Sequence, residues 1–186
     1  MEERNELVQR LRTQRPAAWD QLPDFSLYMD QVLAYIDRQV IRFDEEDCLT
    51  AAMVNNYTKS GLVPRAEGKR YHREHLAYLT GIYVLKHILS TRDMDMLIRE
   101  ELAGDLTVEE GYNAFCESLD SALNTIADTI EARPEGDSAA NAAISLALLS
   151  YAAGMASNRY IAQLRAEKEA AGEIEPPKAK KKGKKE

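Results

Sequence analysis

A short polar segment carries side chains that could read the edges of nucleic acid bases. Asn55, Asn56 and Lys59 stand close together in a segment predicted to be helical. Asparagine can form two hydrogen bonds with adenine, and lysine can bond to guanine or to a phosphate. These side chains therefore predict a DNA-recognition helix, in which polar groups contact bases and cations contact phosphates. The alternative is a solvated helix face on which one amide caps a neighbouring loop.

Cations follow this helix and are grouped around a glycine, Gly68. Four of them could hold the phosphate backbone beside the groove: Arg65, Lys69, Arg70 and Arg73. The arrangement is typical of a basic wing, although such charges could also serve solubility alone. Tyr57 and Tyr71 are expected at the edge of the core, and either hydroxyl could still donate to a phosphate.

Positive and negative charges are concentrated in different segments of the chain, and the net charge alone does not show this. The formal net charge is −7, yet Leu49–Arg92 holds seven Lys/Arg and two Asp/Glu, and Pro176–Glu186 holds six lysines and one glutamate. Each segment thus carries +5, and subtracting both from −7 leaves −17 for the other residues. An acidic protein with a basic middle segment is compatible with an oriented DNA surface, because clustered cations dominate contact with phosphates. The lysine tail could bind nucleic acid or acidic partners, or simply be a solubilising end.

The sequence contains no motif that predicts an enzyme active site or a metal site. No phosphate-binding loop or nucleophile motif is present, and Asp44–Asp47 forms one acidic run, so we expect neither an enzyme nor a cofactor. His72 and His75 have no third ligand nearby, which argues against a metal site. Cys48 and Cys116 are expected to be small buried side chains in a reducing cytoplasm, and the N-terminus shows no secretory signal.

Helices are expected to position the polar and basic residues described above. Helical periodicity and caps predict four helices before Gly104, which span about Ser26–Val40, Leu49–Ser60, Arg73–Leu89 and Thr91–Gly104. Asp24 or Ser26 is expected to cap the first, and Gly61 to end the second in a left-handed conformation. Thr91 is the expected cap of the fourth.

Two longer helices are predicted after Gly104. Thr107 and Glu110 form a capping box, and the heptad-like apolar spacing of both segments predicts an antiparallel helical hairpin. Ala139–Met155 is free of charge, but alanine dominates it and asparagine and serine interrupt it, so a buried helix is expected there and not a membrane span. The lysine-rich end is expected to be disordered.

The stretch "MVNNYTKSGLVP…GKRYHREHLAYLTGIYVLKHILS" resembles the winged helix-turn-helix of the MerR type. In that family the recognition helix ends in a tyrosine, two or three residues and Gly-Leu, and a basic wing leads to a tyrosine that opens the next helix. The longer region Trp19–Glu101 is similar to the YkrK-like bacterial family, a domain of unknown function. The resemblance implies fold and DNA binding, without a demonstrated activity.

The MerR pattern can be carried over to single positions of this sequence. Asn55 falls where the family often places a DNA-contacting arginine, Tyr57 matches its second tyrosine, and Lys69 matches the basic residue of the wing. Asn56 replaces the first tyrosine and Gly68 replaces the aromatic residue of the wing. The resemblance therefore implies the architecture more strongly than the individual contacts.

Together these patterns predict an all-α fold with a small β wing. The expected parts are a lead-in (1–23), a MerR-like winged helix-turn-helix domain (24–104), a hairpin that would dimerise the protein or sense a signal (105–170), and a disordered tail (171–186). The expected function is that of a cytoplasmic bacterial transcriptional regulator that binds double-stranded DNA as a homodimer, without a membrane and with an unknown small-molecule effector. The alternative is a protein-interaction scaffold on the same fold that does not bind DNA.

Overall fold

The computed structural model describes residues 2–39, 47–104 and 106–174. It divides into two units, Met1–Ala142 and Ala143–Glu186, which we describe separately. Within the described residues the secondary structure is helical, with seven α-helices, one 3-10 helix and no strand. The predicted all-α class is therefore confirmed. The boundary of the first unit lies beyond the sixth α-helix, whereas the sequence pattern placed a boundary near Gly104.

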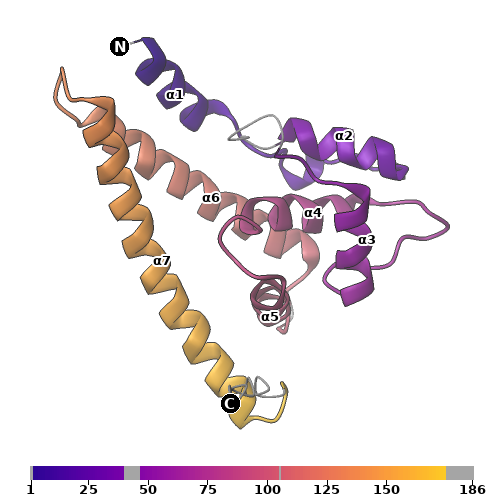
Figure 1. Cartoon of the computed structure of the whole chain (residues 1–186). Helices are drawn as coiled ribbons and strands as arrows, with labels where there is room; N and C mark the ends of the chain where they lie inside the picture. Colours follow the sequence, from indigo (N-terminus) through magenta and orange to yellow (C-terminus); the bar gives the residue numbers. More distant parts are fainter. Residues whose placement is uncertain (1, 40–46, 105, 175–186) are drawn as a thin grey trace, which may run out of the picture. The chain divides into compact units, whose positions relative to one another are not determined.

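The first unit runs through seven helical elements before the last helix of the chain (Figure 1). They are α1 (Glu2–Thr13), η1 (Trp19–Gln21), α2 (Met29–Gln39), α3 (Ala51–Ser60), α4 (Arg73–Leu85), α5 (Thr91–Glu101) and α6 (Val108–Glu131). Five of these match predicted helices, although α4 ends four residues before Leu89. The sequence pattern did not predict α1, and Val40, the predicted end of α2, lies outside the described residues.

The core of this unit forms where α2, α3 and α4 pack together. Six of its aliphatic side chains are completely buried: Val32, Ile36, Val54, Leu76, Leu79 and Ile82. They recur every three or four residues along their helices, so each helix turns one apolar face inward. Met94 of α5 and Tyr112 of α6 complete this core. Because α4 contributes three of the six residues, it is the central helix of the unit.

Arginines of α1 and of the segment after it form hydrogen bonds and ion pairs with α6, and α1 buries Val8. The Arg4 guanidinium donates to the carbonyls of Ile130, Glu131 and Arg133 at 2.7, 2.9 and 3.0 Å, at the C-terminal end of α6 and just beyond it. Arg12 pairs with Asp128 and Glu131, each at 2.6 Å, and Arg15 pairs with Asp120. This chemistry explains why a charged lead-in without a strong apolar pattern forms a docked helix.

The caps at the N-terminal ends of the helices follow the sequence pattern in one case and depart from it in two. Thr107 and Glu110 form the predicted capping box of α6. At α2, the Gln31 side chain accepts from the Tyr28 N–H at 2.9 Å, so neither Asp24 nor Ser26 has the predicted role. At α5, Ser90 rather than Thr91 accepts from the Asp93 N–H, at 3.1 Å.

Asp47 joins the segment before α3 to the end of α4. Its carboxylate accepts from the Tyr83 hydroxyl at 3.0 Å and from Lys86 Nζ at 2.6 Å, and it lies 3.1 Å from Nε2 of His87. Burial alone would raise the pKa of Asp47, but the hydrogen bonds from Lys86 and Tyr83 outweigh it and lower that pKa. The folded state therefore favours the ionised carboxylate.

We expect this linkage to appear in the pH dependence of stability. A carboxyl group whose pKa is lowered by folding stabilises the protein above its ordinary pKa of about 4, and this contribution disappears as pH falls through the lowered value. Asp47→Asn should therefore reduce the free energy of unfolding at pH 7, and the difference from the parent protein should shrink toward pH 2. Urea unfolding at several pH values measures this, with the exposed Asp24→Asn as a control that shows no comparable loss. A difference that does not vary with pH would contradict the linkage.

The second unit contains most of α7 (Ala139–Ala170). Within that unit no other described helix is present to cover its apolar side chains, among them Leu148, Tyr151 and Met155, which are all exposed. By length and composition alone α7 is apolar enough to cross a membrane, and its most apolar window is unburied. The expectation of a buried helix is therefore not met, while its helical conformation is confirmed. The pairing of α6 with α7 stays a prediction.

Candidate nucleic-acid interface

Local interactions define both ends of α3. The Thr50 side chain accepts a hydrogen bond from the Met53 N–H at 3.2 Å and so caps the first turn. At the other end Gly61 has φ of 81°, in the left-handed region where glycine avoids the strain of a side chain. The Leu62 N–H then bonds to the Tyr57 carbonyl at 2.9 Å. The predicted end of the helix at Gly61 is therefore confirmed.

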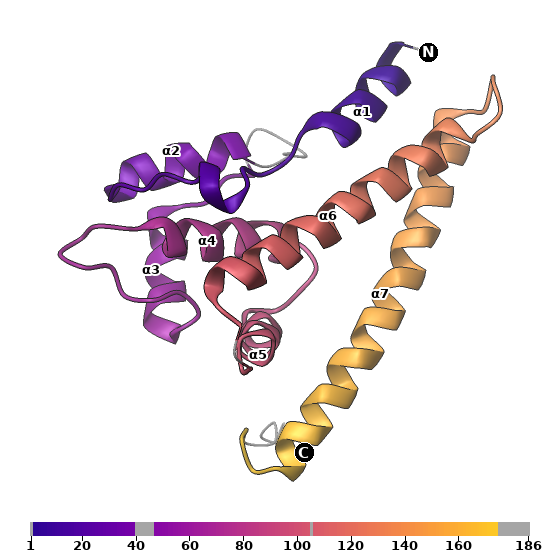
Figure 2. The same cartoon turned by 180° about the vertical axis from the view of Figure 1, so that it is seen from behind.

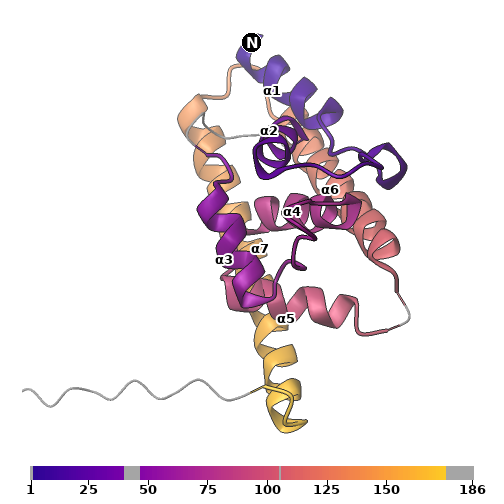
Figure 3. The same ribbon diagram turned by 90° about the vertical axis from the view of Figure 1, so that its right-hand side faces the viewer.

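The two faces of α3 differ in polarity. Val54 is fully buried and Tyr57 is nearly so, which holds this face against α2 and α4. Asn55, Asn56 and Lys59 lie on the exposed face. Figure 3 faces the side of the molecule that carries α3 and shows α4 next to it, with α2 seen nearly end-on above them. The structure thus turns outward the three side chains that the sequence pattern assigned to base reading.

A tight turn follows between α3 and α4. Glu67 and Arg70 exchange two backbone hydrogen bonds, of 3.1 and 2.9 Å, across Gly68 and Lys69. Both central residues have positive φ, 56° and 69°, as a type I′ turn requires. No strand flanks this turn in the described part of the chain, so the predicted β wing is replaced by a loop with two isolated bridges. Figure 2 shows the loop projecting beside α3.

Lys69 is unusual because it adopts this conformation with a side chain. It is the only residue other than glycine with a positive φ in the described ranges. Such a conformation costs on the order of 1 kcal/mol for an L-residue, and strain of this kind is common at functional sites. The turn therefore presents an exposed ammonium group at its tip, at some cost in stability.

Arg70 is held on the surface by the segment before α2. Its guanidinium donates to the Ser26 hydroxyl at 3.0 Å and lies 4.9 Å from the centre of the Tyr28 ring. Leu27 stands between Ser26 and Tyr28 in the chain, and Tyr71 follows Arg70. Leu27 and Tyr71 exchange backbone hydrogen bonds of 2.8 and 2.9 Å. Ser26 and Tyr28 were not predicted as positioning residues, because only the tertiary contact brings them to Arg70.

His75 fixes the other side of the loop. Its ring is buried, Nδ1 accepts from the His72 N–H at 3.0 Å, and Nε2 lies 3.3 Å from the Arg65 carbonyl. An imidazole that accepts through Nδ1 carries its proton on Nε2, and can donate that proton to the carbonyl. The histidine pair thus organises the loop, and the described residues contain no group of three or more metal-binding side chains.

Two of the eight predicted DNA-binding residues, Tyr57 and Arg73, are wholly or partly buried. Tyr57 is only 7% exposed, and burial raises the pKa of its hydroxyl. Arg73 is half-buried, and its guanidinium lies 5.8 Å from the centre of the Trp19 ring. Six of the eight predicted residues remain exposed, and we call them the candidate surface: Asn55, Asn56, Lys59, Arg65, Lys69 and Arg70.

The fold and this surface define an all-α protein that presents a polar helix and a basic turn to solvent. The chain belongs to the DUF1836 family, a domain of unknown function whose family model matches residues 17–115. The match runs from the segment before η1 into α6 and includes the whole candidate surface. Comparison with curated proteins and with solved structures finds no match to this chain.

Proposed function

We propose that this protein is a cytoplasmic bacterial transcriptional regulator that binds double-stranded DNA through the candidate surface. The observation that carries the proposal is the exposed polar face of α3, followed directly by the strained turn at Lys69. In this arrangement Asn55, Asn56 and Lys59 read the site, while Arg65, Lys69 and Arg70 hold the phosphate backbone. The four cations are accompanied by one acidic residue, Glu67, within Ala51–Tyr71.

The proposed architecture is that of a MerR-type winged helix-turn-helix, as the YkrK-like resemblance implies. In it α3 is the recognition helix, α2 is the supporting helix, and the loop before α4 takes the place of the wing. Two features differ from the simplest form of this motif. Residues 40–50 separate α2 from α3, where a turn of three or four residues is usual, and the loop has isolated bridges in place of strands.

The proposed assembly is a homodimer that involves α7. Leu148, Tyr151 and Met155 are exposed on this helix, and the alanines among them would let another helix approach closely. A two-fold dimer carries two copies of the candidate surface, so its preferred DNA site would be palindromic.

Selection from genomic DNA tests the proposal. The six lysines of Pro176–Glu186 are replaced by serine, so that the tail cannot supply binding without sequence preference. The protein is mixed with fragmented genomic DNA near physiological salt, and the retained fragments are sequenced. We expect an enriched palindromic motif, and Asn55→Ala should relax the preference at particular bases by about 1–3 kcal/mol. The matched control is Asn5→Ala in α1, which should leave the motif unchanged.

Other outcomes of this selection would change the assignment. Retention without a motif would contradict sequence reading by α3 and indicate non-specific binding. No retention would favour the second candidate, a protein-interaction scaffold. The acidic balance of the residues outside the basic segments favours that candidate, because it repels DNA everywhere else on the molecule.

A further inference from the structure

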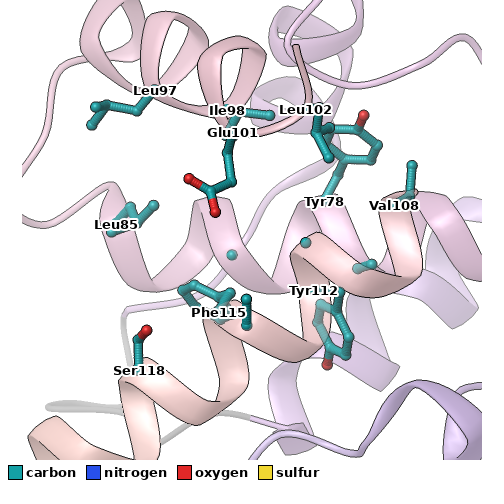
Figure 4. Close-up of a pocket in the computed structure, with 14 residues that line it drawn as sticks. Tyr78, Leu85, Leu97, Ile98, Glu101, Leu102, Val108, Tyr112, Phe115 and Ser118 are labelled. Carbon is teal, nitrogen blue, oxygen red and sulfur yellow. The ribbon is translucent and has the colours of Figure 1, made fainter. Parts of the chain in front are cut away.

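A cavity of about 310 Å³ opens between α4, α5 and α6 (Figure 4), and none of its lining residues belongs to the candidate surface. This volume lies at the lower end of the range of small-molecule sites in proteins, which is roughly 300–1,000 Å³. The helices that enclose it belong to the first unit, and α4 also contributes three fully buried residues to the core. A ligand in this cavity would therefore contact a part of the protein that is held in place by the core.

Small residues on two neighbouring helices create the hollow. Ala77 and Gly81 stand one turn apart on α4, and Gly111 and Ala114 stand one turn apart on α6. A Cβ atom on Gly81 would meet no other atom within 4 Å, so this glycine leaves open space next to its helix. At Gly111 a Cβ would come within 3.0 Å of Cδ2 of Leu102, so that glycine permits the close approach of Leu102, the residue that follows α5, to α6.

The walls are mostly apolar and carry one carboxylate. Leu85, Leu97 and Phe115 face the cavity from three different helices. Glu101, at the end of α5, is the only charged residue of the lining, and its carboxylate points toward the cavity between α5 and α4 (Figure 4). Tyr78, Tyr112 and Ser118, which carry hydroxyl groups, also belong to the lining. An apolar chamber with one anionic group at its rim is complementary to a molecule with an apolar body and one cationic end.

We propose that this cavity binds a small amphiphilic amine. The apolar body lies over Gly81 and Phe115, and the ammonium group pairs with the Glu101 carboxylate. Binding removes apolar surface of both partners from water, and this provides most of the affinity. The ion pair at the solvent-exposed rim selects the charge of the ligand. This inference does not depend on DNA binding, and its test uses no DNA.

Three probes with the same apolar body test the selection by charge. They are 4-phenylbutylamine, 4-phenylbutanol and 4-phenylbutyrate, titrated into the full chain and followed by calorimetry and by two-dimensional NMR. We expect the amine to bind about fivefold more tightly than the alcohol, the size of effect typical of an ion pair open to solvent, and the acid to bind most weakly. The largest NMR shifts should map to residues of α4, α5 and α6 that line the cavity.

Two variants separate the role of the carboxylate from that of the hollow. Glu101→Gln should abolish the preference for the amine over the alcohol, while Glu109→Gln, an exposed carboxylate outside the lining, should leave it unchanged. Gly81→Leu should fill the hollow and abolish binding of all three probes. Gly81→Ala is its control for folding, because alanine favours the helix and should raise the Tm.

The outcomes that would overturn the proposal are specific. If none of the three probes binds the full chain, or if the alcohol and the acid bind as tightly as the amine, the cavity is not an amine site. If Gly81→Leu folds and binds the amine as the parent does, the ligand lies elsewhere. Should Gly81→Leu fail to fold, the comparison of Glu101→Gln with Glu109→Gln still decides the question.

Discussion

Replacing Lys69 and Arg70 by alanine is expected to weaken DNA binding on the order of 100-fold for every DNA sequence. A charge-assisted hydrogen bond to a phosphate contributes roughly 1.5–3 kcal/mol, and this variant removes two such contacts. Since each phosphate contact releases counterions, the slope of log K against log salt should fall by about 2. Fluorescence anisotropy with a fixed DNA duplex, titrated at several salt concentrations, measures both quantities.

A charge-matched control is available in the same chain. Arg10→Ala combined with Arg159→Ala removes two exposed arginines that lie outside the candidate surface. This control should change the affinity slightly and leave the salt slope nearly as it is in the parent. If the two double variants lose the same affinity, net charge alone governs binding, and the turn has no specific role.

Lys69→Gly separates the side chain from the backbone at the tip of the turn. Glycine adopts a φ of 69° without strain, so the free energy of unfolding should rise by about 1 kcal/mol. DNA affinity should nevertheless fall as far as it does with Lys69→Ala. A gain in stability together with a loss of affinity would show that the lysine is kept for its charge. Unchanged affinity would remove Lys69 from the interface.

Leu79→Ala is expected to have the largest effect on stability. Leu79 is completely buried in α4, the helix that packs against both α2 and α6. Truncating a buried leucine removes apolar contact and leaves a cavity, at a cost of about 2–5 kcal/mol. For a domain whose total stability is typically 5–15 kcal/mol, such a loss is large enough to populate the unfolded state. Urea unfolding followed by circular dichroism measures it.

The matched control for this truncation lies in α1. Leu7 is 44% exposed, so Leu7→Ala removes the same atoms from a site that remains in contact with water. Its expected effect is within about 0.5 kcal/mol, as is usual for surface positions. An equal loss in both variants would contradict the assignment of the core to α2, α3 and α4.

Helical segments were predictable here because their signals are local. The apolar spacing of α2, the capping box at Thr107 and Glu110, and the glycine that ends α3 each act within a few residues. The first helix was missed because its contacts with α6 join residues more than 100 positions apart in the chain. Cys48 was expected to be buried and is exposed, since the type of a single residue does not fix its place relative to the core.

The outward orientation of the polar side chains of α3 was also predictable from the sequence. Once Val54 and Tyr57 face the core, a period of 3.6 residues turns Asn55, Asn56 and Lys59 outward. The placement of the arginines was not predictable in this way. Arg70 reaches Ser26 and Tyr28, and Arg73 lies over Trp19, because the fold brings the segment before α2 against the start of α4.

The sequence by itself therefore determined the helical class, most helix positions and the polar face of α3, since these follow from periodicity and capping within single turns. Tertiary structure alone decided which cations remain exposed and that the expected β wing is a strained turn at Lys69. It also decided that Gly81 and Gly111, on different helices, enclose one cavity. Each of these outcomes depends on contacts between distant segments, whose energies no local pattern of residues encodes.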